Sequence, residues 1–325
     1  MRTISFSEAT LEAMTEEMER DSKVFVMGED IAAQGGIFGQ FKGLPQRFGK
    51  ERVIDTPISE TAIVGAGVGA AMAGMRPVVD MHFADFIGVC MDEILNQMAK
   101  ARYMFGGQCG MPLVLRAPDG IIRSAAAQHS QSLEAFFLHI PGIKVVIPSN
   151  PADAKGLLKA AIRSEDPVLY FEHKALFPMK GEVPEGDYIV EIGKAAVPRE
   201  GKDVKIVSYS LMMHRVHEAA EILEKEGISA EVIDLRTISP LDMETIYNSI
   251  RKTHRLVIVH EAVKTGGVGA EIAARIAEEA MDELDATIRL LGAPFVPVPF
   301  SPSLEKLVKI TGEDIAQAAL EICKE

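Results

Sequence analysis

The chain has 325 residues, a length that fits two domains of ordinary size. Hydrophobic residues make up 47% of it and charged residues 25%, which is typical of a globular protein with a large core. A formal charge of −13 without any long basic cluster argues against a nucleic-acid partner. Its 3 cysteines are far apart, which excludes a closely spaced cysteine metal site and favours a reduced, cytoplasmic setting.

No apolar run is expected to cross a membrane. The best candidate, residues 62–75, is too short and too rich in glycine for a transmembrane helix. The N-terminus leads directly into an acidic amphipathic stretch, which fits neither a signal peptide nor a transit peptide. We therefore predict a cytoplasmic protein without a membrane partner.

The first part of the chain alternates between short apolar runs and longer amphipathic runs. The runs predict strands at residues 23–27, 52–55, 76–83, 111–116, 143–147 and 168–172. They predict helices at residues 7–20, 61–74, 85–103, 132–139 and 151–164. Such alternation is typical of a mainly parallel sheet with helical crossovers.

The second part repeats this alternation after a stretch, residues 177–202, that prolines and glycines interrupt. Its runs predict strands at 204–209, 230–235, 255–260 and 287–291, and helices at 211–226, 241–252 and 268–284. The predicted fold is therefore α/β, with two tandem domains of mainly parallel sheet. We place the domains at 1–178 and 203–325, with a linker at 179–202.

The stretch Val53–Glu60 is predicted to be a short strand, a turn and the start of a helix. Pro57 fixes φ and disfavours helix at Thr56, so the strand is expected to end there. Ser59 can cap the next helix, which places Glu60 in the first turn, at the sheet edge where α/β proteins bind ligands. Two interpretations stay open: a carboxylate favoured by the helix dipole, or a buried acid facing a cofactor.

A polar island, Gln128–Gln131, lies between three alanines and an apolar predicted helix that Ser132 can cap. An ordinary exposed loop and a functional site are both consistent with this island of hydrogen-bonding side chains. A serine hydrolase would use His129 together with a serine and an acid. A serine-hydrolase role is disfavoured, because the chain has no Gly-x-Ser-x-Gly nucleophile elbow.

Two further candidates, His82 and Phe86, lie in the stretch 82–86 that closes the predicted strand 76–83, at the same sheet edge as Glu60. Phe86 is either a core residue or an aromatic face for a flat heterocycle. Glycines at 65–69 lie inside a predicted helix and not at a strand–helix turn. Close helix packing therefore explains them better than a dinucleotide site.

Five motifs occur together and in order: Asp55–Glu60, Gln128–Gln131, Pro141–Pro148, Asp153–Leu158 and Asp234–Pro240. With them, the chain resembles the beta subunit of the thiamine-diphosphate-dependent decarboxylating component of 2-oxo acid dehydrogenase complexes. The resemblance runs from about Ser5 to Pro302. Segments 85–88, 102–107 and 125–133 are most like the acetoin-cleaving members, and the pyruvate and branched-chain members share much of this pattern.

The resemblance implies a transketolase-like pyrimidine-binding domain followed by a transketolase C-terminal domain. It also implies an α2β2 heterotetramer with thiamine diphosphate at each αβ interface, and a lipoyl acyltransferase component as acceptor. Such enzymes hold the diphosphate and Mg²⁺ through a Gly-Asp-Gly motif, which this chain lacks. That half of the site is therefore expected on the alpha subunit.

The resemblance also implies roles for individual residues. Glu60 would hydrogen-bond the ring nitrogen N1′ of the aminopyrimidine, and Phe86 would stack on that ring. Ile58 and His82 would lie beside the cofactor. His129 would donate a proton or a hydrogen bond while the acyl unit passes to the lipoyl group.

Relatives in this family hold a structural K⁺ with main-chain and side-chain oxygens. The matching positions in this chain are Leu113, Ala161, Ile162, Ser164 and Asp166. Ser164 stands where several relatives carry Asp. These five residues are the candidate potassium site.

The predicted function is therefore the beta subunit of an acetoin or 2-oxo acid (pyruvate-type) dehydrogenase component. One alternative within the family is the branched-chain 2-oxo acid dehydrogenase. An alternative of another class is a non-catalytic scaffold for the acyltransferase core, which would not need Glu60, Phe86 and His129 together. A stand-alone transketolase-like enzyme is disfavoured by the missing diphosphate motif.

Overall fold

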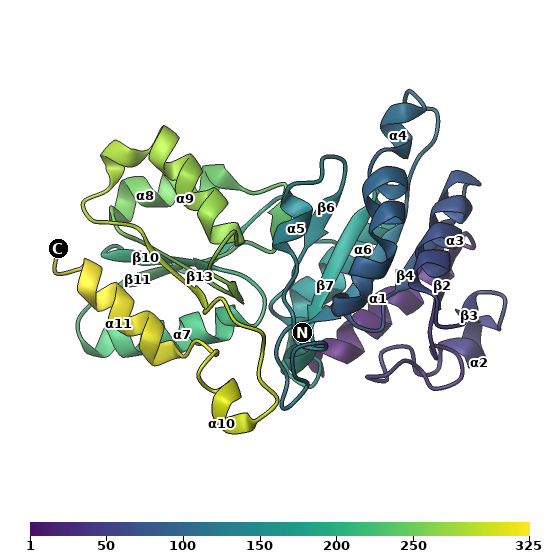
Figure 1. The fold of residues 1–325 in the computed structure, drawn as a ribbon, viewed down its shortest axis with the longest axis horizontal. Helices are drawn as coiled ribbons and strands as arrows, with labels where there is room; N and C mark the ends of the chain where they lie inside the picture. The colour runs from purple at the N-terminus through teal and green to yellow at the C-terminus, as the bar shows by residue number, and fades with distance from the viewer. The chain divides into compact units, whose positions relative to one another are not determined.

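The computed structural model describes residues 1–325, which form two compact units (Figure 1). The first unit comprises Met1–Asp119 and Phe136–Ile192, and the second comprises Gly120–Ala135 and Gly193–Glu325. Each unit has its own mainly parallel sheet with helices, which confirms the predicted α/β fold class. The predicted domain boundaries at 178 and 203 stay a prediction.

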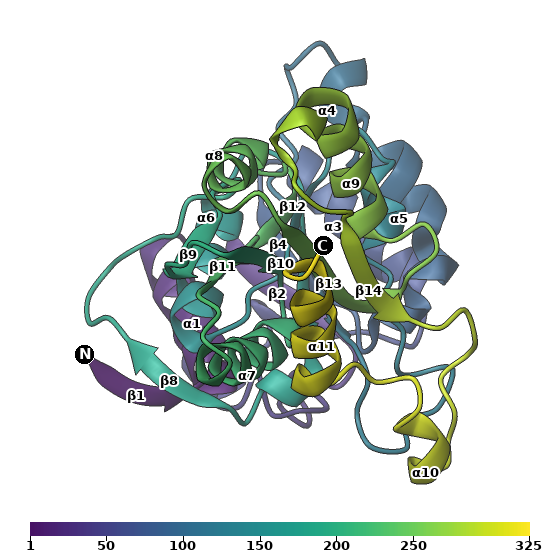
Figure 2. The same cartoon turned by 90° about the vertical axis from the view of Figure 1, so that its left-hand side faces the viewer.

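The sheet of the first unit joins its strands in the order β6-β7-β5-β4-β2-β3, all parallel. Its strands are β2 (Val24–Gly28), β3 (Val53–Asp55), β4 (Arg76–Asp80), β5 (Val114–Asp119), β6 (Lys144–Val146) and β7 (Val168–His173). A separate antiparallel pair, visible in Figure 2, joins β1 (Arg2–Ser5) to β8 (Lys180–Val183). The parallel order brings the carboxyl ends of β2, β3 and β4 to one edge.

Helices cover both faces of this sheet. They are α1 (Phe6–Arg20), α2 (Leu44–Phe48), α3 (Glu60–Met72), α5 (Ala135–Leu138) and α6 (Pro151–Arg163). A capping box between Ser5 and Glu8 starts α1, and Asn150 caps α6 by accepting a hydrogen bond from the Asp153 N–H. These local signals explain why the two helices begin where they do.

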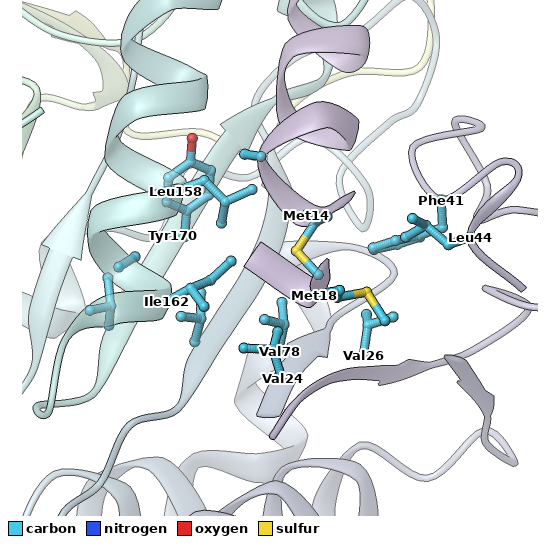
Figure 3. Close-up of a cluster of buried hydrophobic side chains, with 14 of the residues drawn as sticks. Met14, Met18, Val24, Val26, Phe41, Leu44, Val78, Leu158, Ile162 and Tyr170 are labelled. Atoms are coloured by element: carbon cyan, nitrogen blue, oxygen red, sulfur yellow. The ribbon is translucent and has the colours of Figure 1, made fainter. Parts of the chain in front are cut away.

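The core of the first unit lies where α1 and α6 pack on the sheet (Figure 3). Met14, Met18, Val78, Leu158 and Ile162 are all at most 2% exposed there. Helix α3 packs on the opposite face, where a Cβ on Gly67 would lie 2.5 Å from Val79. Val78 and Val79 thus point to opposite faces of β4, as successive strand residues do.

The segment after β4 differs from its prediction. We expected one helix over 85–103, and this was wrong: the chain forms a 3₁₀ helix η1 (Ala84–Cys90), a π-helical segment η2 (Glu93–Met98) and a short α4 (Ala101–Met104). In η1 every third residue is buried, namely Ala84, Ile87 and Cys90. That spacing suits three residues per turn better than 3.6.

The second unit holds a sheet in the order β14-β13-β10-β11-β9, in which only β9 is antiparallel. Its strands are β9 (Ala196–Arg199), β10 (Val204–Ser208), β11 (Ala230–Asp234), β13 (Leu256–Val263) and β14 (Arg289–Ala293), and a further short strand is β12 (Thr237–Ser239). Its helices are α7 (Met212–Lys225), α8 (Met243–Thr253), α9 (Val268–Glu279), α10 (Pro302–Glu305) and α11 (Gly312–Ile322). Helices α7 and α11 lie on one face of this sheet, and α8 and α9 lie on the other (Figures 1 and 2). None of the helices in either unit is both long enough and apolar enough to span a membrane.

Candidate active site

Three titratable side chains meet at the carboxyl edge of the first sheet. Glu29 follows β2, Glu60 begins α3 after β3, and His82 follows β4. Gly28 is in register with both Asp55 and Asp80, so the residues that follow these three strands are neighbours. His82 Nδ1 lies 3.5 Å from Glu29 Oε2, and both side chains are largely buried.

The pKa of Glu29 depends on the other charged groups at this edge. Burial raises the pKa of the Glu29 carboxyl, His82 opposes the rise, and the negative charges of Glu60 and Asp30 add to it. Sequence reasoning missed Glu29. Its signal was an acid placed directly after a buried strand, at the same edge as Glu60.

Glu60 occupies the first position of α3, as predicted, and is half-buried. The expected side-chain cap is absent, because the Ser59 hydroxyl makes no capping bond and the helix starts with the Ser59 carbonyl accepting from Ile63 N–H at 2.9 Å. Ile58, two residues before Glu60, is 81% exposed, whereas Ile63 and Val64 of α3 are buried. Within this chain, Glu60 is therefore open on the Ile58 side.

Phe86 stands in η1 as part of an aromatic group. Its ring meets Phe83 edge-on, with centroids 6.1 Å apart, and Phe83 in turn meets Phe38 at 6.0 Å and His82 at 5.7 Å. Phe86 is only half-buried. Its ring is thus held by a neighbour while part of its surface stays accessible to a ligand.

A glycine-rich loop after Glu29 is anchored beside this group. The Asp55 carboxylate accepts hydrogen bonds from the N–H groups of Ala32 and Ala33 at 2.6 and 3.0 Å. Gly35 and Gly36 both have φ near +80°, a conformation that favours glycine. Asp55 in the first motif therefore positions the loop and not a ligand.

His129 lies in the second unit, on the segment 120–135, and is half-buried. Glu261 accepts from Ile121 N–H at 2.7 Å and from the Ser132 hydroxyl at 3.3 Å, and Glu134 accepts from the Tyr209 hydroxyl at 2.7 Å. Ser132 therefore bonds Glu261, and the expected helix from 132 is shorter and begins at residue 135. These bonds hold the polar island in place on either side of His129.

The five candidate potassium positions make other contacts. Arg76 Nη1 donates to the carbonyls of Ile162 and Ser164 at 3.0 and 3.1 Å, and Lys144 donates to the Ser164 hydroxyl at 3.1 Å. The Asp166 carboxylate pairs with both Lys144 and Arg102.

The remaining two carbonyls lie within ordinary backbone bonds, Leu113 accepting from Val168 and Ala161 accepting from Ser164. Cationic side chains thus already bond three of the five residues, and this arrangement does not fit an ion held there by free oxygens. The potassium site stays a prediction.

Comparison with known families identifies the class first. Residues 2–180 match the model of the transketolase pyrimidine-binding domain, and residues 193–315 match that of the transketolase C-terminal domain. A solved structure described as a split-gene transketolase, an inactive beta4 tetramer, superposes with a TM-score of 0.81 at 25% identity, covering 99% of this chain and 98% of that one. The chain is therefore a two-domain protein of the transketolase type.

Proteins that are similar over their full length identify the family within this class. The chain is 50% identical to the acetoin:2,6-dichlorophenolindophenol oxidoreductase subunit beta of Cupriavidus necator, over 99% of this chain and 98% of the relative. It is 48% identical to the 2-oxoisovalerate dehydrogenase subunit beta of Bacillus subtilis over the whole of both chains. It is 46% identical to the pyruvate dehydrogenase E1 component subunit beta of Rhizobium meliloti, over 99% of this chain and 70% of the relative. The chain belongs to the family of beta subunits of thiamine-diphosphate-dependent dehydrogenase components, which confirms the predicted family.

Proposed function

We propose that this chain is the beta subunit of a component that cleaves acetoin or a 2-oxo acid and passes the acyl unit to a lipoyl group on an acyltransferase. The observation that carries the proposal is the grouping of Glu29, Glu60 and His82 at one sheet edge, with the accessible ring of Phe86 nearby. The relatives named for acetoin, 2-oxoisovalerate and pyruvate support the same class of small-molecule substrate.

The residues of this edge suit the aminopyrimidine half of thiamine diphosphate. When bound, that cofactor supplies a thiazolium electron sink for the cleaved bond. Glu60 would hold a proton against the ring nitrogen N1′, where positioned acid–base groups contribute typically ~10²–10⁴-fold. Phe86 would stack its ring on the pyrimidine, and Ile58 and His82 would flank it.

His129 serves the second half of the reaction in this proposal. Its imidazole would donate a proton or a hydrogen bond to the acyl unit during transfer to the lipoyl sulfur. The bonds of Glu261 and Glu134 support such a role, because they hold the segment on either side of His129 in place. A positioned side chain loses little entropy when it binds its substrate.

An alpha subunit would complete the site in an α2β2 assembly. Ile58 is 81% exposed beside Glu60, and an apolar side chain next to a catalytic acid suits burial by another chain. The chain contains no Gly-Asp-Gly motif, so the diphosphate and Mg²⁺ are assigned to the alpha subunit. A branched-chain 2-oxo acid is the alternative substrate, and a cytoplasmic location stays a prediction.

The test is an assay of the αβ enzyme with thiamine diphosphate, Mg²⁺ and a lipoyl acceptor. Acetoin, pyruvate and branched 2-oxo acids are compared by kcat/KM, and the best of them defines the substrate. Glu60→Ala should remove nearly all activity while the complex still assembles. Glu51→Ala, at an exposed glutamate before β3, is the matched control and should stay near wild type.

Near-normal activity of Glu60→Ala would remove the catalytic role of Glu60. Tight binding to the acyltransferase core without turnover of any of these substrates would instead favour the scaffold alternative.

A further inference from the structure

A second acid, Asp80, lies below the edge that carries Glu29 and Glu60. It is the last residue of β4 and only 2% exposed. The strand register sets it beside Gly28 on β2 and beside Arg116 on β5. A Cβ on Gly28 would lie 2.9 Å from the Asp80 Cβ, so the missing side chain at Gly28 leaves the room that Asp80 occupies.

The cationic side chain next to Asp80, Arg116, is already paired with another acid, Glu172. Arg116 donates from Nε and Nη2 to the two carboxylate oxygens of Glu172, both at 2.8 Å, and its guanidinium lies 4.9 Å from the centre of the Phe41 ring. Arg116 and Glu172 are both fully buried. A bidentate pair of this kind fixes the guanidinium in one orientation.

Asp80 is thus a second buried carboxyl that shares one guanidinium with Glu172. Its Oδ1 has no hydrogen-bond partner, and neither has Nη1 of Arg116. Burying an ionised carboxylate that leaves one oxygen without a hydrogen bond is unfavourable, so such a group takes up a proton instead.

The groups that face Asp80 come from three strands and one loop. Burial raises the pKa of Asp80 to about 7; Arg116 opposes the rise, Glu172 and Glu29 add to it, and a side-chain hydrogen bond with Gln40 of the glycine-rich loop opposes it. An acid with a raised pKa keeps its proton below that pH and loses it as the pH rises through it. Asp80 is therefore protonated in weakly acidic solution and ionised in weakly alkaline solution.

We propose that Asp80 is a positioning residue that acts as a neutral carboxylic acid, and that its neutral state keeps a further negative charge away from Glu29, the partner of His82 next to Glu60. An ionised Asp80 would place a further negative charge against Glu29, which already feels Glu60. That charge would further favour the protonated form of Glu29 and so oppose its pairing with His82. The net charge around Glu29 and Glu60 thus depends on whether the buried Asp80 carboxyl carries a proton.

This inference rests on the proposed function for its catalytic consequence, but not for its charge state. Asp80→Asn tests both, because an amide has the shape of the acid and stays neutral at every pH. If only the neutral form supports activity, about one tenth of wild type is neutral one pH unit above its pKa. At pH 8 the αβ enzyme with Asp80→Asn should therefore be about tenfold more active than wild type, and the two should agree within about twofold at pH 6.

A readout without substrate separates this inference from the proposed function. The melting temperature of the full αβ complex should fall between pH 5 and pH 8 more steeply in wild type than in Asp80→Asn. Glu172→Gln is the second variant: it frees Arg116 to pair with Asp80, so the carboxylate is stabilised and this extra slope should shrink.

Two outcomes would overturn the proposal. In one, Asp80→Asn assembles but has lost activity at every pH, which means that the carboxylate itself is needed. In the other, the pH profiles of wild type and Asp80→Asn coincide in both activity and melting temperature. If no substrate is turned over but the melting curves differ as described, the charge state of Asp80 stands and the proposed reaction fails.

Discussion

The first unit has two groups of partly or fully buried acids, and pKa values are shifted in opposite directions in the two groups. Between α1 and α6, Lys155 and Lys159 bond Glu16, and Arg163 bonds Glu17 at 2.6 Å. Burial works against ionised Glu16, yet the two lysines lower its pKa overall. At the edge of the sheet, burial raises the pKa of both Glu29 and Asp80.

The number of basic side chains near the acids explains why the pKa values shift in opposite directions. Each acid between the helices has a basic side chain within bonding distance, so its charge is matched and its role is structural. At the edge, Arg116 serves Glu172, and Glu29 has only a histidine. At this edge burial favours the protonated forms of Glu29 and Asp80, and acids with shifted pKa values are typical of sites of acid–base chemistry. Unmatched charge, and not the number of acids, therefore marks the functional region.

The same substitution, Glu→Gln, made once in each region should have the largest difference in effect. Glu60→Gln should lower kcat by about 10²–10⁴-fold, because the amide cannot exchange a proton with the cofactor. Glu16→Gln should leave kcat within about twofold and lower the stability, because it weakens two ion pairs. Steady-state assays and thermal melts of both variants measure this. Equal effects of the two changes on kcat would show that the two regions do not differ in function.

The pH dependence of unfolding gives the next largest effect. Asp80 has a folded-state pKa of about 7 against an ordinary 3.8, so the folded chain binds more protons than the unfolded chain between these values. The free energy of unfolding should therefore fall as the pH rises through this window, by up to about 4 kcal/mol, and level off above it. Urea unfolding of the full chain between pH 4.5 and 8 measures it, and the difference from Asp80→Asn isolates Asp80. Parallel curves for the two proteins would contradict the shift.

The ion pair between α1 and α6 should contribute a smaller interaction energy, which we expect to be independent of pH near neutrality. Lys159 is 1% exposed and pairs with Glu16, so a double-mutant cycle of Lys159→Met and Glu16→Gln should give a coupling energy of about 1–2 kcal/mol. Urea unfolding at pH 7 supplies the four values. Lys23→Met, at an exposed lysine, is the control and should change the stability by less than about 0.5 kcal/mol. A coupling near zero would mean that the ion pair stabilises nothing.

The smallest expected effect concerns potassium. Arg76 and Lys144 already bond oxygens of Ile162 and Ser164, so exchanging Na⁺ for K⁺ at constant ionic strength should barely change the melting temperature of the αβ complex. A clear rise with K⁺ would show that the ion binds at these five positions despite the two cations. Arg76→Met would then be expected to increase the dependence on K⁺.

Most of the local structure could be predicted from the chain itself. The Ser5–Glu8 box, Pro151 at the start of α6 and the apolar strands are local signals, and the corresponding elements begin and end within a few residues of their predicted bounds. The prediction failed where packing overrode local preference. In η1, contacts at every third residue replaced the expected α-helix, and Ser132 bonds Glu261, 129 residues away, and not the start of a helix.

The sequence by itself determined the family, the α/β class and the placing of Glu60 at a helix start, because strand and helix periodicity and the motif order are written along the chain. Only the tertiary structure decided which acids lie together. Glu29, Asp80 and Glu172 are far apart in sequence and lie at three different strand ends, and the fold pairs Arg116 with Glu172 and not with Asp80. Charge interaction depends on distance and burial, and neither can be read from sequence spacing.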